Sequence, residues 1–162
     1  MNRKKCLTIA VAAALLVAAA ICLYFLAGHH YLTLRDRNGR LYARYRMEEG
    51  DSFSISFIHS VNRLPLWDIY EIHEGKIYVE ACKYGNFGAG VQSDLNPGEV
   101  MSFTEDGFIL ITGIHQDRSN MRYNIAGISD HMLELPDGTL INLRELCGKG
   151  APVWFNYEYL IF

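Results

Sequence analysis

The hydrophobic residues of this chain follow two patterns, a long uncharged run near the start and an apolar–polar alternation through the rest. The alternation is clearest at 52–57, where Phe53, Ile55 and Phe57 fall on one side of an extended chain and three serines on the other. One face of such a strand is buried. The same pattern predicts strands at 31–36, 41–47, 52–57, 67–73, 76–84, 100–103, 108–112, 123–128, 131–135, 139–143 and 153–162.

Turn residues separate these segments. Asn38-Gly39 is typical of a tight hairpin in which both turn residues have positive φ, and Glu74-Gly75 predicts a second hairpin. A helical signal is found at 143–147, which is short enough to be a single turn between strands. Short strands therefore dominate the segment after the uncharged run.

Strands this short bury their apolar faces only if two sheets pack together or one sheet closes on itself. We therefore predict an all-β domain of about eight to ten strands. A β-sandwich is favoured over a small barrel.

The uncharged run covers residues 6–27 and would span about 33 Å as a helix, slightly more than the hydrocarbon core of a bilayer. It predicts one transmembrane helix. The alternative is a cleaved signal peptide, whose apolar region is usually about 7 to 15 residues long and ends in a small-x-small site. The greater length of this run, with its alanines in the middle, favours a retained anchor.

Basic residues flank this run on its N-terminal side, because residues 3–5 are Arg, Lys and Lys and no Lys or Arg follows before Arg35. The positive-inside rule then places the following domain outside the cytoplasm. We expect residues 1–28 to form a cytoplasmic basic stub and a membrane anchor. Residues 29–162 should form an extracytoplasmic β-domain attached to the cell membrane.

Charge and size exclude several classes of protein. Residues 28–162 carry 12 basic and 18 acidic side chains, a formal charge of -6, which does not favour nucleic-acid binding. With 162 residues, of which 50% are apolar, the chain is too short for a polytopic transporter or a multi-domain enzyme and too apolar for a disordered tail.

Two of the four cysteines, Cys82 and Cys147, belong to the predicted domain. Outside the cytoplasm they could form a disulfide, which would close a loop of roughly 65 residues and stabilise the fold by about 4 kcal/mol. They could equally be two buried free thiols. Neither lies in a CxxC motif, so they predict no redox or zinc site.

The usual catalytic and metal-binding motifs are absent from the sequence. There is no GxSxG, so His59-Ser60 does not predict a serine hydrolase, and neighbouring residues of a strand point to opposite faces. His59, His73, His115 and His131 show neither HExxH nor a close His-x-His spacing. We expect no catalytic residue, no metal and no cofactor; a hydrolase or metal enzyme is the least favoured alternative.

Polar residues concentrate directly after the strand at 52–57. Here His59, Ser60, Asn62 and Arg63 could form one polar loop, in which Arg63 holds a carboxylate in a two-pronged contact and Ser60 or His59 donates a further hydrogen bond. This arrangement would suit a small organic anion. The alternatives are a structural role, with Arg63 paired internally, or contact with a partner protein.

A glycine-rich loop follows at 85–90 and includes Phe87, Gly88 and Gly90. It lacks the Lys-Ser/Thr ending of a phosphate-binding loop and no helical pattern follows it. We expect its glycines to permit positive φ or a close backbone approach at a sheet edge. The loop could bring Phe87 over the polar loop that contains His59.

These residues also resemble a known family, the bacterial domain of unknown function 1850. Its members share a His-Ser-Val segment after an aromatic-rich strand, then a Pro, an acidic residue on the next strand and a Gly-Ala-Gly turn. The matching residues are His59, Ser60, Val61, Pro65, Asp68, Gly88, Ala89 and Gly90, and the resemblance covers most of the predicted domain. The chain departs from the family where Glu is usual at the position of Asp68, and where Leu-Pro often follows the glycines instead of Val91-Gln92.

The resemblance implies a function only through gene neighbourhood. Genes of this family often lie beside the membrane and TAXI-type solute-binding components of tripartite ATP-independent periplasmic (TRAP) transporters. The resemblance thus implies that this chain is a non-enzymatic accessory protein in the uptake of an organic anion. Its partners would be the transporter membrane subunit and the solute-binding protein. The alternative is an assembly subunit without a small-molecule ligand. The ligand or partner would meet the residues His59, Ser60, Asn62, Arg63, Asp68, Phe87, Gly88 and Gly90.

Overall fold

The structure, a computed structural model, describes residues 3–60, 63–87, 94–127 and 129–161. The chain forms two compact units. One contains the N-terminal helix up to His30 together with the C-terminal segment from Tyr159, and the other is Tyr31–Glu158.

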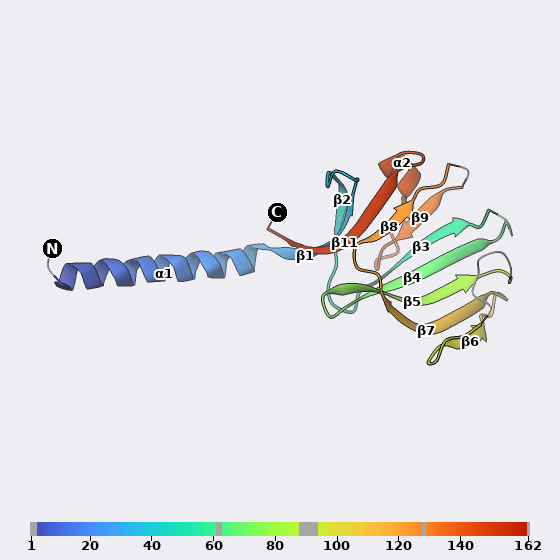
Figure 1. Ribbon diagram of the computed structural model, residues 1–162, viewed down its shortest axis with the longest axis horizontal. Helices are drawn as coiled ribbons and strands as arrows, with labels where there is room; N and C mark the ends of the chain where they lie inside the picture. Colours follow the sequence, from blue (N-terminus) through green and yellow to red (C-terminus); the bar gives the residue numbers. More distant parts are fainter. Residues whose placement is uncertain (1–2, 61–62, 88–93, 128, 162) are drawn as a thin grey trace. The chain divides into compact units, whose positions relative to one another are not determined.

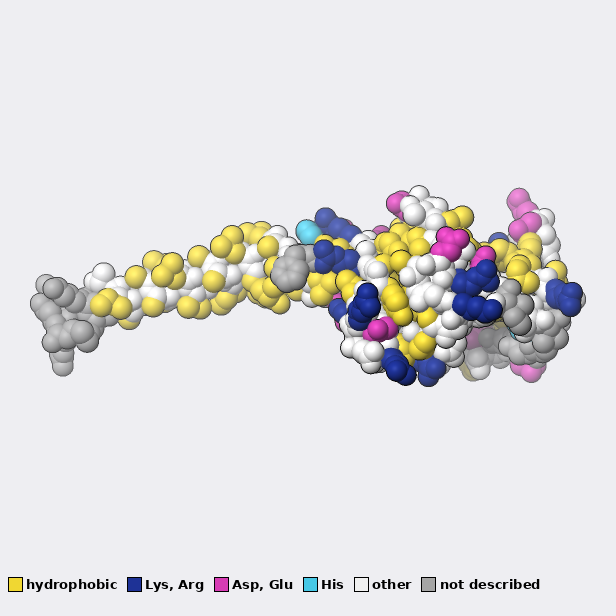
Figure 2. Space-filling model, turned by 90° about the horizontal axis from the view of Figure 1, so that it is seen from above, with side chains coloured by type: hydrophobic (Ala, Val, Ile, Leu, Met, Phe, Trp, Pro, Cys, Tyr) yellow, Lys and Arg dark blue, Asp and Glu magenta, His cyan; other side chains and the backbone are white. Residues whose placement is uncertain are grey.

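The N-terminal helix α1 extends over Arg3–Ala27 and includes an apolar stretch, Leu7–Ala27, that is long enough to cross a membrane. None of this stretch is buried against protein, and Figure 2 shows hydrophobic side chains along it. The Tyr159 hydroxyl donates to the carbonyl oxygen of Tyr24 at 2.8 Å. A membrane anchor and a signal sequence share these properties, so the structure confirms the apolar helix and leaves its orientation a prediction.

The second unit consists of short strands, as the alternating pattern predicts (Figure 1). The strands are β1 (His29–Arg35), β2 (Leu41–Arg46), β3 (Ser52–Ile58), β4 (Pro65–His73), β5 (Lys76–Tyr84), β6 (Val100–Phe103), β7 (Ile109–Asp117), β8 (Met121–Asn124), β9 (His131–Glu134), β10 (Leu140–Asn142) and β11 (Pro152–Leu160). The described residues thus contain eleven strands, as many as the segments that the alternation marks and one more than the upper end of the expected total of about eight to ten.

The strands form two antiparallel sheets, which confirms the all-β sandwich. One sheet has four strands in the order β2-β1-β11-β8, and the other has seven in the order β10-β9-β3-β4-β5-β7-β6. The predicted helical turn is α2 (Leu143–Cys147). Asn142 is its N-cap, and the Asn142 side chain accepts hydrogen bonds from the backbone N–H groups of Arg144 and Glu145.

The tight two-residue turn with two positive φ angles occurs at a different hairpin from the one expected. Glu74 and Gly75, with φ of 50° and 70°, join β4 to β5 directly. The hairpin predicted at Asn38-Gly39 does join β1 to β2, but only the glycine there has positive φ, so the expectation of two positive φ angles was wrong. Here the Asp36 carboxylate accepts hydrogen bonds from the backbone of Asn38 and Arg40, and these bonds stabilise a wider turn.

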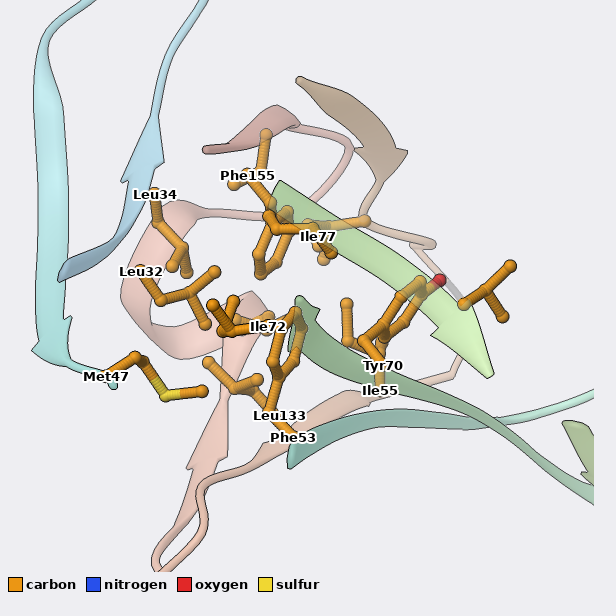
Figure 3. Close-up of a cluster of buried hydrophobic side chains, with 14 residues drawn as sticks. Leu32, Leu34, Met47, Phe53, Ile55, Tyr70, Ile72, Ile77, Leu133 and Phe155 are labelled. Atoms are coloured by element: carbon orange, nitrogen blue, oxygen red, sulfur yellow. The ribbon is translucent and has the colours of Figure 1, made fainter. Parts of the chain in front are cut away.

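The main core lies between the two sheets and contains fourteen buried residues (Figure 3). Leu32 and Phe155 of the four-stranded sheet meet Phe53, Ile55 and other residues of the seven-stranded sheet. The face of the seven-stranded sheet that carries these residues is called the inner face below. A second, smaller cluster on this sheet consists of Leu66, Tyr84, Ile109 and Ile111.

The two domain cysteines are free thiols, so the disulfide that Cys82 and Cys147 could have formed is not present. The physical reason is their placement, because Cys147 packs against the main core and Cys82 packs against the second cluster. Burial raises the pKa of the Cys147 thiol to about 11.

Candidate functional site

A carboxylate stands on the inner face of the central strand β4. This strand alternates so that Leu66, Tyr70 and Ile72 are buried on the inner face, and Asp68 shares this side. Its neighbours across the sheet are Ile55 on β3 and Cys82 on β5. Asp68 is therefore half-buried between the two hydrophobic clusters rather than on the solvent face of the sheet.

Two tyrosines connect this carboxylate to the other sheet. The Tyr123 hydroxyl, on β8, donates a hydrogen bond to the Asp68 carboxylate. The Tyr70 and Tyr123 oxygens lie 3.0 Å apart. Because Tyr123 has one hydroxyl proton and gives it to Asp68, Tyr70 must be the donor to Tyr123. The result is a directed chain of two hydrogen bonds that ends on Asp68.

Burial and charge keep the protons on these groups at neutral pH. Burial and the negative charge of Asp68 raise the pKa of Tyr70, while the positive charge of Arg118 opposes the increase. The pKa of Tyr123 is raised by burial and by its neighbours Tyr70 and Asp68. Burial raises the pKa of the Cys82 thiol to about 12, and a hydrogen bond with Asp68 adds to the effect. Cys82 is therefore a poor nucleophile.

A cavity of about 590 Å³ opens beside Asp68, within the range usual for sites that bind small molecules. Its apolar wall includes Phe57, Leu66, Val79 and Ile114. Its polar groups include His59, Ser60, Asp68, Gln116, Arg118, Asn124, Ser129 and His131. A second cavity of about 410 Å³ shares Asp68 and Arg118 with the first.

Arg118 is the cation at this cavity. It follows β7 directly, where its backbone N–H donates to the carbonyl of Ile77 at 2.8 Å. Its side chain is exposed and has no ion-pair partner within the described part of the chain. A guanidinium in this situation can bind a carboxylate with two parallel hydrogen bonds.

His131 forms part of the cavity wall next to the apolar residue Phe57. It is 5% exposed, and its ring stacks on Phe57 with the centroids 4.8 Å apart. Its Nδ1 accepts a hydrogen bond from the backbone N–H of Ala126 at 3.4 Å. Burial lowers the pKa of His131, against the opposing effects of the Ser129 backbone and Asp130, so the ring is neutral at pH 7.

A third cavity, of about 950 Å³, lies at the end of the β3–β4 hairpin. Its walls include His59 and Ser60, which it shares with the first cavity, and also Arg63 and Trp67. Arg63 has a φ of 55°, and its backbone N–H donates to the carbonyl of His59 at 2.9 Å. This hydrogen bond joins the two described ends of the expected polar loop, and the loop remains a prediction because residues 61–62 lie outside the described residues.

The structure brings only some of the predicted site residues together. His59 and Ser60 line both the first and the third cavity, Asp68 lines the first, and Arg63 lines the third. Phe87 contacts Tyr84 edge-on with centroids 6.0 Å apart. The predicted residues Asn62, Gly88 and Gly90 lie outside the described residues.

Several cavity residues were missed by sequence reasoning. Tyr123, Arg118 and His131 reach Asp68 or its cavity from strands far away in the sequence. The alternation of Leu66, Asp68 and Tyr70 along one strand was the available signal, because it places a carboxylate on a buried face.

No curated protein and no solved structure matches this chain. A family model described as Domain of unknown function (DUF1850) matches residues 53–141, more than half of the chain. The matched range extends from β3 into β10 and contains Asp68, Arg118, Tyr123 and His131. The chain therefore belongs to the DUF1850 family.

Proposed function

We propose that this chain is a membrane-anchored, extracytoplasmic and non-enzymatic accessory protein that binds a small organic acid for a TRAP-type solute transporter. The observation that carries the proposal is the cavity in which Arg118, without an ion-pair partner among the described residues, stands near Asp68. Such a pair of opposite charges recognises a ligand that has both an anionic group and a hydrogen-bond donor.

Arg118 would receive the carboxylate of the ligand. Its exposure leaves the guanidinium accessible from solvent, and its charge is close enough to Tyr70 to affect that residue's pKa. A bidentate contact between arginine and carboxylate fixes the orientation of the ligand as well as its charge.

Asp68 would accept a hydrogen bond from a hydroxyl or ammonium group on the same ligand. The Tyr123 hydroxyl occupies one of its oxygens, Oδ2, and a carboxylate can accept several hydrogen bonds. The apolar wall of Phe57, Leu66 and Ile114 would cover the carbon skeleton. A hydroxy acid or an amino acid meets all three requirements.

The transporter part of the proposal is supported by the family membership and by the apolar helix α1. The three basic residues before the apolar stretch of the helix favour an external domain. There the domain could meet both an extracytoplasmic solute-binding protein and the transporter's membrane subunit.

Ligand binding is tested by the thermal stability of the full chain in detergent, measured with malate, glutamate and succinate. We expect a saturable rise of Tm with malate or glutamate, since a ligand that binds only the folded state stabilises it. Arg118→Gln and Asp68→Asn should each weaken binding about tenfold or more, which corresponds to the loss of a charge-assisted hydrogen bond. Arg37→Gln, in an exposed turn away from the cavity, is the matched control.

Two outcomes would contradict the proposed binding of an organic acid. One is that none of the three acids raises Tm, and the other is that Arg118→Gln binds as tightly as Arg37→Gln. Purification of the tagged full chain from native membranes, followed by mass spectrometry, tests the association with the transporter separately. Transporter subunits found without any ligand binding would favour the assembly role, and their absence would contradict the transporter association.

A further inference from the structure

Two histidines lie side by side on the outer face of the seven-stranded sheet, opposite the face that forms the cavity. His73 ends β4 and His115 lies in β7, and their ring centroids are 5.6 Å apart with an angle of 63° between the planes. Their side chains are 46% and 57% exposed. Solvent therefore reaches both rings.

Each ring has a carboxylate beside the same nitrogen. Nδ1 of His115 is 2.7 Å from Oε1 of Glu80, and Nδ1 of His73 is 3.8 Å from Oε1 of Glu49. The Glu49 carboxylate, at 3.8 Å, adds negative charge beside His73. Only the His115 contact is short enough for a hydrogen bond, and when Nδ1 donates this bond the lone pair is on Nε2. This is the arrangement that orients histidines toward metal ions in proteins.

Neighbouring groups hold these side chains in place. Tyr78 stacks on His115, with centroids 4.6 Å apart and an angle of 14° between the planes. Glu49 accepts hydrogen bonds from the backbone N–H groups of Glu74 and Gly75 in the β4–β5 turn. The site is therefore partly organised before any ion arrives.

The backbone at His115 is also unusual. Its φ is 42°, in the left-handed region that residues other than glycine rarely adopt. The pairing of β5 with β7 shifts register between Val79 and Ala81, so that Glu80 stands at an irregularity opposite this segment. Backbone strain of this kind is found where a side chain has to be aimed at a specific place.

We propose that His73 and His115 bind one divalent transition-metal ion, such as Zn²⁺, through their Nε2 atoms. Two imidazoles at bond lengths of about 2.0–2.1 Å and a tetrahedral angle have ring centroids about 5 Å apart, close to the separation of these rings. Imidazole nitrogens suit zinc, copper and nickel, whereas magnesium and calcium need oxygen ligands.

The surrounding charge favours a cation. Glu49 and Glu80 lie beside the two rings, and Glu71 and Glu74 lie at the end of β4 and in the β4–β5 turn. Lys76 is paired with Asp117 at 2.9 Å. The described residues provide no group of three His, Cys, Asp or Glu side chains arranged to hold a metal ion. Water would complete the coordination, so the ion would exchange readily, unlike the ion of a closed structural site. This site is independent of the organic-acid cavity.

The test is calorimetric titration of the full-length protein in detergent, after removal of metals, with ZnCl₂ and with MgCl₂. We expect one Zn²⁺ per chain and no binding of Mg²⁺. His73→Ala and His115→Asn should each abolish this binding; asparagine is chosen because it tolerates the left-handed backbone. Glu80→Gln should weaken Zn²⁺ binding by about tenfold, as loss of a carboxylate behind a ligating histidine does.

His29 and His30 provide the matched control, because they are the only two histidines that are adjacent in the sequence. The double variant His29→Ala, His30→Ala should bind Zn²⁺ like the parent. The proposal is overturned if His73→Ala retains full affinity, or if the control loses the site. Circular dichroism without metal checks the fold of each variant, and if His115→Asn fails to fold, His73→Ala alone decides.

Discussion

The hydroxyl of Tyr123 on β8 donates a hydrogen bond to the carboxylate of Asp68 on β4, and this contact connects the two sheets through a polar group in the interior. A half-buried carboxylate loses much of its hydration, so the donor from the opposite sheet replaces part of what water would give. The sheets are thus held together at this point by a directional contact as well as by apolar packing.

Replacing Tyr123 by Phe should destabilise the fold by about 1–3 kcal/mol, because the carboxylate would keep its burial and lose a donor. The measurement is urea unfolding of the full chain followed by tryptophan fluorescence. Tyr42→Phe is the control, since Tyr42 also packs against the main core and its hydroxyl has no hydrogen bond among the described residues. Equal stability of the two variants would show that the Tyr123–Asp68 contact contributes nothing.

The stability of the domain should fall in acid through Glu158. This carboxylate on β11 accepts hydrogen bonds from the Thr33 hydroxyl at 2.9 Å and from Arg35 at 2.7 Å. Desolvation raises the pKa of Glu158, but the hydrogen bonds and charge of Arg35 and the hydrogen bond of Thr33 together lower it below its usual 4.5. The stability that the ionised Glu158 contributes is therefore fully present above about pH 4.5. It is lost as the pH falls through the lower pKa of the folded state.

Thermal unfolding of wild type and Glu158→Gln between pH 7 and pH 3 checks this prediction. The difference in Tm between the two proteins should be largest near neutral pH and should shrink in acid. Glu48→Gln serves as the control, because the ion pair between Glu48 and Arg46 is exposed to solvent and contributes little to stability. A Tm difference that stays constant over the whole pH range would contradict a titrating Glu158.

Gly113 should tolerate alanine less well than Gly107 does. Both glycines have positive φ, 76° and 82°, but a Cβ at Gly113 would lie 2.6 Å from the carbonyl oxygen of Gly98, whereas a Cβ at Gly107 meets nothing within 4 Å. Gly107→Ala should therefore cost about 1 kcal/mol for its backbone angle alone. Gly113→Ala should cost clearly more, because a backbone atom has to move. Urea unfolding of the two variants measures the difference, and equal costs would exclude the clash.

The thiols of Cys82 and Cys147 should be unreactive in the folded protein and reactive after unfolding. Their raised pKa values, about 12 and about 11, leave almost no thiolate at pH 8. Alkylation with iodoacetamide, followed by intact mass without reductant, should label both only in denaturant. If neither is labelled in denaturant until a reductant is added, the cysteines form the disulfide that the structure lacks.

Local pattern was enough to predict most of the strands. Phe53, Ile55 and Phe57 alternate with serines, and the structure has β3 there with Phe53 and Ile55 buried. The Glu74-Gly75 turn was also found where expected. These features depend on neighbours in the chain, so their signal is present in a short window of sequence.

Pairing between distant strands could not be predicted in the same way. β3 lies between β4 and β9, and β1 lies between β2 and β11, because sheet order depends on which apolar faces meet in three dimensions. The candidate site depends on this order, since Tyr123 and Arg118 reach the region of Asp68 from later strands. The polar loop at His59 was accessible to sequence reasoning, whereas the groups opposite it were not.

The unequal sizes of the two hydrophobic clusters have a consequence for how the domain opens. Among the described residues, the main core has fourteen buried side chains, from both sheets, from α2 and from two loops, whereas the second cluster has four from one sheet. Amide protons of β6 and the adjoining part of β7 should then exchange with deuterium through partial unfolding, while those of β3 and β11 exchange only when the whole domain unfolds. If exchange follows this pattern, the cavity beside Asp68, which is lined by residues of both clusters, would border the part of the domain that opens first, and its entrance could widen without loss of the sandwich.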